Sequence, residues 1–106
     1  MESDFPDAYA VAAAAYHIRQ AIEKLLKALI LLNGEQPAFT HNISKLVAHC
    51  EKLGVALPEP LDDLAEALTL WEVEIRSDPS FPISPKKYGK AKSVYEALKQ
   101  TIGGCL

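Results

Sequence analysis

Apolar residues recur every three or four positions in four separate stretches of the chain, which is the spacing of amphipathic helices. The stretches predict helices over about residues 6–32, 43–53, 60–76 and 85–102. No run alternates apolar and polar residues for long enough to predict a strand. Because each predicted helix has one apolar face and the connections are short, we expect one all-α domain over residues 1–106. Its expected form is an antiparallel up-and-down four-helix bundle.

Residues typical of helix ends mark these boundaries. Pro6 suits the first helical position, because its missing N–H would be unpaired there in any case. Asn33-Gly34 and Gly103-Gly104 are expected to end the first and last helices, since both residue types tolerate the left-handed conformation found at helix ends. A side chain at Thr40 or Asn42 is expected to cap the second helix.

The first helix has the broadest apolar arc and a polar arc opposite. The residues expected in the core are Ile18, Ala21, Ile22, Leu25, Leu26, Ala28, Leu29 and Leu32. Tyr16, Arg19 and Glu23 are expected beside the polar arc. Ile30 and Leu31 fall on that arc as exceptions, which together with the alanine run 12–15 hints at a second contact surface.

The other three helices have narrower apolar stripes. Their predicted core residues are Ile43, Leu46, Val47, Cys50 and Leu53, then Leu61, Leu64, Ala65, Leu68, Trp71 and Ile75, and last Ala91, Val94, Tyr95, Leu98 and Ile102. Glu72 falls inside the third stripe, where a carboxylate needs a polar or cationic partner. Arg76, one turn later, is the expected partner.

Composition narrows the functional classes. The 106 residues carry a formal net charge of -3, so the chain as a whole does not favour duplex nucleic acid or anionic membrane. The longest apolar run, residues 28–32, is far shorter than a membrane span. The acidic start lacks the order of a signal peptide, and two cysteines without a partner spacing fit a reducing compartment, so a cytoplasmic location is expected.

Catalytic and metal-binding patterns are not evident. No Ser, His and Asp cluster and no glycine-rich phosphate loop is recognisable, and His41, His49 and Cys50 do not have the spacing of metal ligands. Cys50 is expected to be a buried small hydrophobe. We therefore expect no metal, no cofactor and no catalytic residue of a standard type.

One polar face does stand out. His17, Gln20, Lys24 and Lys27 follow one strip of the first helix, which we call the cationic strip. Lysines there can contact phosphate, and Gln and His can orient a ligand by hydrogen bonding. The alternative is a solvated face with Arg19–Glu23 and Glu23–Lys27 pairs worth only about 0.2–0.5 kcal/mol each. His41, in a turn, and Arg76, at a helix end, are the remaining candidates.

Three segments in order resemble the HEPN family, the higher eukaryotes and prokaryotes nucleotide-binding family. They are "AAYHIRQAIEKLLKALILLNG", "THNISKLVAHCEKLG" and "EIRSDP". The matching positions are Gln20-Ala21, Glu23-Lys24, Lys27-Ala28 and Leu29 or Ile30 in the first helix, then Thr40-His41 with Asn42, and Arg76 closing the third helix. The resemblance covers about residues 8–102.

The resemblance implies an all-α bundle and a homodimer. It also implies a partnership with a minimal nucleotidyltransferase in a toxin–antitoxin-like pair, and binding of a nucleotide or RNA. Many relatives are metal-independent ribonucleases that use an Arg followed, after four to six residues, by a His. Here neither Arg76 nor Arg19 has a His at that distance.

The resemblance therefore favours a non-catalytic binding module, with His17, Gln20, Lys24, Lys27, His41 and Arg76 as its ligand- or partner-binding residues. Two alternatives stay open. One is a ribonuclease toxin with a nonstandard site, in which His17 or His41 is the general base across a dimer. The other is a pure protein-interaction module.

Overall fold

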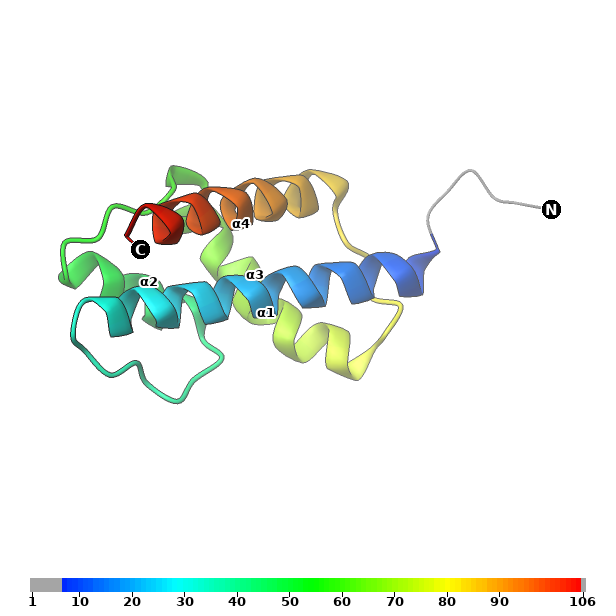
Figure 1. Cartoon of the computed structure of the whole chain (residues 1–106). Helices are drawn as coiled ribbons and strands as arrows, with labels where there is room; N and C mark the ends of the chain where they lie inside the picture. The colour runs from blue at the N-terminus through cyan, green and yellow to red at the C-terminus, as the bar shows by residue number, and fades with distance from the viewer. Residues whose placement is uncertain (1–6, 106) are drawn as a thin grey trace.

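A computed structural model describes residues 7–105, with side chains described as far as residue 103. Its four helices are α1 (Ala8–Leu32), α2 (Ile43–Lys52), α3 (Glu59–Ser77) and α4 (Pro85–Cys105) (Figure 1). The described residues contain no strand. The predicted all-α four-helix bundle is confirmed.

Of the two ends of the helical region, the C-terminal one differs from the prediction. Helix α1 begins at Ala8, because the side chain of Asp7 accepts a hydrogen bond from the backbone N–H of Tyr9 at 3.1 Å and caps the helix. The predicted start at Pro6 lies outside the described residues. Helix α4 continues through Gly103-Gly104 to Cys105, so the predicted stop there is wrong. Glycine permits a left-handed turn but does not force one.

The inner boundaries lie at residues that are typical of helix ends. Gly34 and Gly54 both have a φ of 81°, which an L side chain adopts only with strain. Asn42 caps α2 by accepting a hydrogen bond from the backbone N–H of Lys45 at 3.1 Å. Thr40 instead accepts one from the N–H of Asn42 at 3.0 Å and shapes the turn before the helix.

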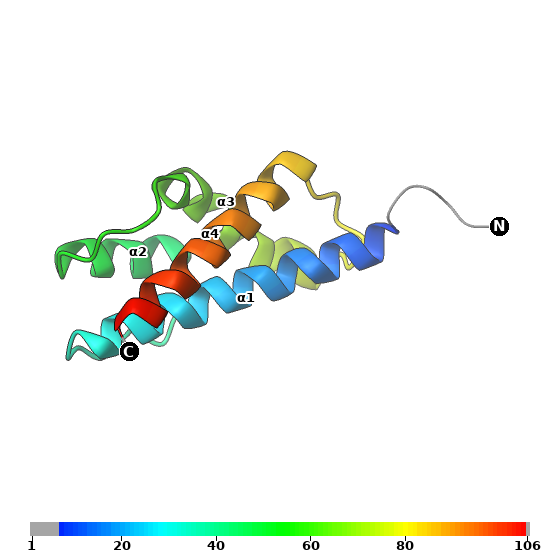
Figure 2. The same cartoon turned by 45° about the horizontal axis from the view of Figure 1, so that its top comes forward.

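Helices α1 and α3 form the centre of the bundle, and each packs against the other three. In Figures 1 and 2, α3 runs opposite to α1, and α4 crosses over α1. The connection 33–42 carries the chain back alongside α1, so that α2 runs in the same direction as α1. This first connection therefore departs from a plain up-and-down succession, and it places residues 35–42 next to the polar side of α1.

The core stripes of three helices are confirmed. Every predicted core residue of α3 is buried, and those of α2 and α4 are buried or half-buried. Leu53, Tyr95 and Ile102 are the half-buried members and lie at the edge of the core. Cys50 is fully buried, with its thiol 3.7 Å from the carbonyl oxygen of Leu26.

The buried face of α1 is not the face that was predicted. The buried residues of this helix are Ala12, Ala15, Arg19, Ile22, Glu23, Leu26, Leu29 and Ile30. At 100° per residue, their centre is turned by roughly 90° from the centre of the predicted arc. Ile30 is fully buried rather than on the polar arc, and Leu32 is 47% exposed rather than in the core. Arg19 and Glu23 lie inside the bundle, not on its wet face.

No helix in the described part of the chain combines the length and the apolar character that a membrane crossing needs.

Candidate functional site

A buried arginine joins α1 to α3. One terminal nitrogen of Arg19 donates a hydrogen bond to Glu23 Oε1 at 2.8 Å, one turn along α1. Its other terminal nitrogen lies 2.8 Å from Oε2 of Glu72 on α3. Arg19 is only 1% exposed, and Glu23 and Glu72 are 7% and 6% exposed. These three side chains therefore form an ion-paired bridge in which each buried charge has an opposite charge as a neighbour.

The bridge is not completely satisfied. Arg19 Nε is buried without a hydrogen-bond partner. Glu72 Oε2 is also buried without a hydrogen bond, although it forms an ion pair with the guanidinium of Arg19. The guanidinium carbon of Arg19 lies 5.2 Å from the centre of the Tyr16 ring, within the range of a cation–π contact. Burial raises the pKa of Tyr16, and the negative charge of Glu72 raises it further.

The buried bridge extends to the surface at both ends. Glu23 also pairs with Lys27 Nζ at 3.0 Å and with His41 Nδ1 at 3.1 Å, while Glu72 Oε1 accepts a hydrogen bond from Arg76 at 3.1 Å. We call these six side chains the charge network. Burial alone would raise the pKa of Glu23, but hydrogen bonds from Arg19, His41 and Lys27 outweigh burial and lower the pKa below its ordinary value. Glu23 therefore stays ionised at neutral pH.

The charge network presents positive charge to solvent. Its two carboxylates are buried, whereas the side chains of Arg76 and His41 are 67% and 62% exposed. Three permanent cations, Arg19, Lys27 and Arg76, face two carboxylates, so the network carries one excess positive charge even when His41 is neutral. An acidic chain thus has a local positive surface, which favours anionic ligands.

A cavity of about 330 Å³ lies between α1 and the C-terminal end of α3. Its walls are Tyr9, Ala13, Tyr16, His17, Ile75, Arg76 and Pro79, and we call it the tyrosine cavity. Its size falls at the lower end of the range of small-molecule sites. Two aromatic rings, an imidazole and a guanidinium meet there, which are the groups that stack on a base and bind phosphate.

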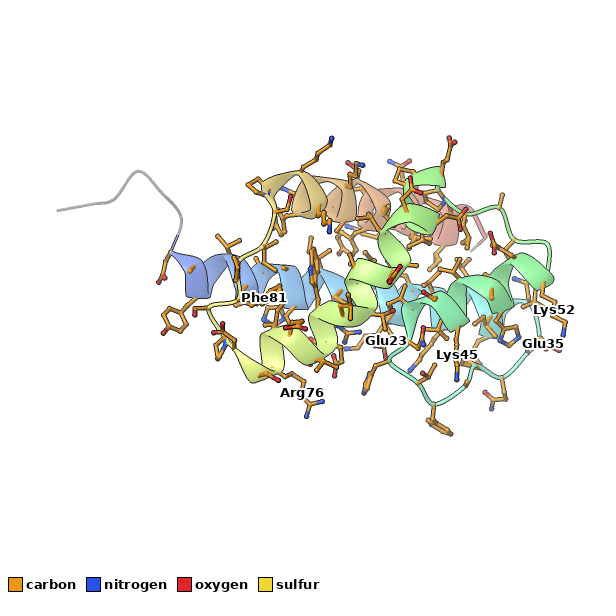
Figure 3. All side chains as sticks on the ribbon, turned by 180° about the vertical axis from the view of Figure 1, so that it is seen from behind. Glu23, Glu35, Lys45, Lys52, Arg76 and Phe81 are labelled. Carbon is orange, nitrogen blue, oxygen red and sulfur yellow. The ribbon has the colours of Figure 1, made fainter. Side chains whose placement is uncertain are left out.

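A second cavity of about 230 Å³ lies beside the connection from α1 to α2. It is lined by Lys27 and by residues 36–39, and we call it the loop cavity. Figure 3 shows Arg76 towards one end of the molecule and Glu23 near its middle, with Glu35 and Lys45 towards the other end. The charge network thus links the end with the tyrosine cavity to the side with the loop cavity.

The structure brings most of the predicted site residues together, in two groups. His17 and Arg76 share the tyrosine cavity, while Lys27 and His41 meet at Glu23. Gln20 is half-buried and Lys24 is exposed, and both continue the cationic strip between the groups. Neither lines the two cavities.

Sequence reasoning missed the residues that hold this surface in place. Arg19 and Glu23 were expected beside the polar arc, and the tyrosines were not singled out. Glu72 was correctly expected inside its apolar stripe with Arg76 as a partner, but its contact with Arg19 was not predicted. A signal was present for the tyrosines, since Tyr9 and Tyr16 are seven residues apart and therefore share a helix face. No spacing in one sequence, however, indicates that Arg19 reaches a carboxylate on another helix.

The Cys50 thiol lies in the core, away from the charge network. Burial, followed by the neighbouring charge of Glu51, raises the pKa of the Cys50 thiol to about 11, so it is protonated and unreactive at neutral pH. In the described part of the chain, no three or more His, Cys, Asp and Glu side chains are grouped to hold a metal ion.

Comparison with known protein families identifies the family of this chain. The family model of the HEPN domain matches residues 3–103, nearly the whole chain. The chain belongs to the HEPN family. A HEPN domain is a nucleotide-binding or RNase-type module, which agrees with a positive surface lined by aromatic rings.

Comparisons with curated proteins and with solved structures give no match.

Proposed function

We propose that this HEPN domain is a non-catalytic binding module for a nucleotide or a nucleic-acid phosphate. One observation carries the proposal: Arg76 and His17 share a single cavity with Tyr9 and Tyr16. A guanidinium and an imidazole suit a phosphate, and aromatic rings suit a base, because every base has a face that stacks.

The contacts of Arg76 support this role. One of its nitrogens is held by Glu72, which fixes the side chain at the cavity, while the remaining donors stay open to solvent. A guanidinium has five N–H donors, so a phosphate can bind without breaking the contact to Glu72. Lys24 and Lys27 on the cationic strip hold further phosphate oxygens, and Gln20 and His17 orient the ligand by hydrogen bonding.

The sequence after Arg76 supports the non-catalytic part of the proposal. Ribonucleases of this family place a His four to six residues beyond the catalytic Arg, whereas here residues 77–83 are Ser-Asp-Pro-Ser-Phe-Pro-Ile. The segment after Arg76 therefore does not supply the His that these ribonucleases use as general base.

Thermal unfolding with added nucleotide tests the binding proposal. ATP or GTP at about 100 times its Kd should stabilise the protein by about 2.7 kcal/mol, which raises Tm by roughly ten degrees in a domain of this size. Arg76→Gln should lose most of that shift. Lys92→Gln, which removes a positive charge from an exposed position on α4, should keep it. An unchanged Tm of the wild type at millimolar ATP and GTP would contradict the proposal.

The family resemblance further supports a homodimer and a minimal nucleotidyltransferase as the partner, in a toxin–antitoxin-like pair. The reading frame next to this one identifies the partner to test. Co-expression of the two tagged chains should yield a complex of fixed stoichiometry. If each chain is recovered alone, the partnership is contradicted, whereas the proposal of nucleotide binding is not affected.

A second candidate activity, metal-independent RNA cleavage, is favoured by one observation. Glu23 holds His41 by Nδ1 at 3.1 Å, and a carboxylate in this position orients an imidazole for proton transfer. A labelled-RNA assay decides between the two candidates. Cleavage by the wild type that disappears in His41→Ala would establish catalysis and overturn the non-catalytic proposal.

A further inference from the structure

Phe39 is fully exposed in the connection between α1 and α2. Its exposure is 108% of the reference value, higher than that of any other large hydrophobic residue among those described. Single exposed apolar side chains are common on protein surfaces, so the side chains that surround Phe39 decide what its exposure indicates.

The connection that carries Phe39 is anchored on both sides. At its start, the side-chain amide of Asn33 donates to the carbonyl of Leu29 at 2.8 Å, and the N–H of Glu35 donates to Ile30 at 3.1 Å. After Phe39, His41 is held by Glu23, and Thr40 and Asn42 form the turn that caps α2. Phe39 therefore projects from a connection whose ends are tied to the bundle.

The neighbours of Phe39 are cationic and polar. It lines the loop cavity together with Lys27, and Lys27 shares the Glu23 carboxylate with His41 two residues after Phe39. Lys24 lies three residues before Lys27 on the same helix face and is exposed. An exposed ring beside basic side chains is the arrangement with which proteins bind unpaired bases, the ring stacking on the base and the cations holding phosphates.

We infer that Phe39, Lys27 and His41 form a second nucleotide subsite, which takes an unpaired base and its adjoining phosphate from a single-stranded nucleic acid. The inference rests on the proposed function, because the cationic strip connects this subsite to the tyrosine cavity. Lys27 lies ten residues after His17, roughly 15 Å along the helix. A mononucleotide in the tyrosine cavity therefore leaves Phe39 free, whereas a short strand reaches both places.

Two adjacent features favour nucleic acid over a protein at this position. The loop cavity contains a lysine, whereas the centre of a protein interface is typically depleted of lysine. Lys27, the permanent charge next to Phe39, also belongs to the charge network with its excess positive charge, which suits a polyanion. The alternative is a protein partner that contacts Phe39, and binding measurements on Phe39 variants distinguish it from nucleic acid.

The test compares a fluorescein-labelled oligoadenylate RNA with ATP on the same variants. Phe39→Leu keeps an apolar side chain but removes the stacking ring, so Kd for the oligoadenylate should rise roughly five- to a hundredfold. Kd for ATP should stay unchanged. Since Phe39 is fully exposed, this variant should fold with the Tm of the wild type, and Leu32→Ala, at an exposed apolar residue outside both cavities, is the matched control.

The salt dependence of binding tests the cationic part of the subsite. For single strands, each phosphate contact contributes roughly 0.7 to the slope of log K against log salt. Lys27→Gln should lower the slope for the oligoadenylate by about this amount, whereas Lys92→Gln should leave it unchanged.

The outcomes separate the inference from the proposed function. Unchanged oligoadenylate affinity in Phe39→Leu, with wild-type binding of ATP intact, overturns the subsite alone. If the wild type binds neither ATP nor the oligoadenylate, both the subsite and the proposed function are wrong. Loss of a co-expressed protein partner in Phe39→Ala, without any change in oligoadenylate affinity, assigns Phe39 to a protein contact and also overturns the subsite.

Discussion

Arg19 connects the core of the bundle with its charged surface. Its guanidinium pairs with Glu23 on α1 and with Glu72 on α3, and these carboxylates in turn hold Lys27, His41 and Arg76. Three cations, Arg19, Lys27 and Arg76, and the imidazole of His41 therefore depend on two buried carboxylates. The same contacts that fix α1 against α3 also fix the positions of the proposed ligand contacts.

Replacement of Arg19 should show this double role. Arg19→Met leaves Glu23 and Glu72 buried with fewer opposite charges, and breaking a buried ion pair by removing one partner costs about 3–5 kcal/mol. Urea unfolding measures this loss against a total stability of about 5–15 kcal/mol. Adding Glu72→Gln should recover part of the loss, because one uncompensated charge is removed. A loss below about 1 kcal/mol in Arg19→Met would show that the bridge contributes little.

The lowered pKa of Glu23 predicts how stability depends on pH. Because the pKa in the folded state lies below its ordinary value of 4.5, Glu23 binds fewer protons when folded. Its contribution is fully present above pH 4.5 and is lost as the pH falls through the folded pKa. The Tm of the wild type should therefore fall more steeply below pH 4.5 than the Tm of Glu23→Gln. Glu66→Gln, at an exposed residue of α3, is the control and should keep the wild-type slope.

At the scale of the elements, the spacing of apolar residues predicted the buried face correctly for α2, α3 and α4 and wrongly for α1. The stripes of α2 and α4 consist of apolar residues alone, and the stripe of α3 contains one charged residue, Glu72, so the periodicity of all three gives the buried face directly. Helix α1 buries Arg19 and Glu23 against α3, and periodicity counts charged residues as solvent-facing. The predicted arc was therefore turned away from α3, towards Ile18 and Leu25, which are only half-buried.

The candidate site was predictable where contacts are local and not where they are distant. Glu72 with Arg76, and Glu23 with Lys27, are four residues apart on a helix, a spacing that a sequence displays. The contact between His41 and Glu23 spans 18 residues and depends on the path of the connection 33–42. That path returns along α1, which helix periodicity does not encode.

The start of α2 provides a prediction for an element. This helix has ten residues, too few to be stable alone, and its first turn depends on the Asn42 side chain and on Thr69, which accepts from the N–H of Ile43 at 3.0 Å. Asn42→Ala should lower the free energy of unfolding by about 1 kcal/mol and Tm by roughly 4–8 °C. Ser44→Ala, exposed in the same turn, should change neither, and calorimetry of both variants measures the difference.

At the scale of the whole molecule, two surfaces differ in character. One is positive and follows the cationic strip, and the other is apolar and lies around the connection 78–84. A groove of about 510 Å³ between the start of α1 and the connection 78–84 is lined almost entirely by apolar side chains. A cavity of about 280 Å³ shares Phe81 and Pro82 with it and continues to Leu70 on α3. Leu70 and Val73 are 52% and 62% exposed. Figure 3 shows Phe81 at the same end of the molecule as Arg76.

This apolar surface is where we expect the proposed homodimer to form, because contiguous exposed apolar groups favour association over solvation. A two-fold dimer uses the same patch on both copies, so one substitution acts twice. Leu70→Asp places two carboxylates in the contact and should convert a dimer into a monomer, as measured by size-exclusion chromatography with light scattering. Lys92→Asp, a charge change on exposed α4, should leave the dimer intact. Because Leu70 lies outside the tyrosine cavity, the monomeric variant should still bind ATP, and a wild type that is monomeric at high concentration would remove the dimer from the proposal.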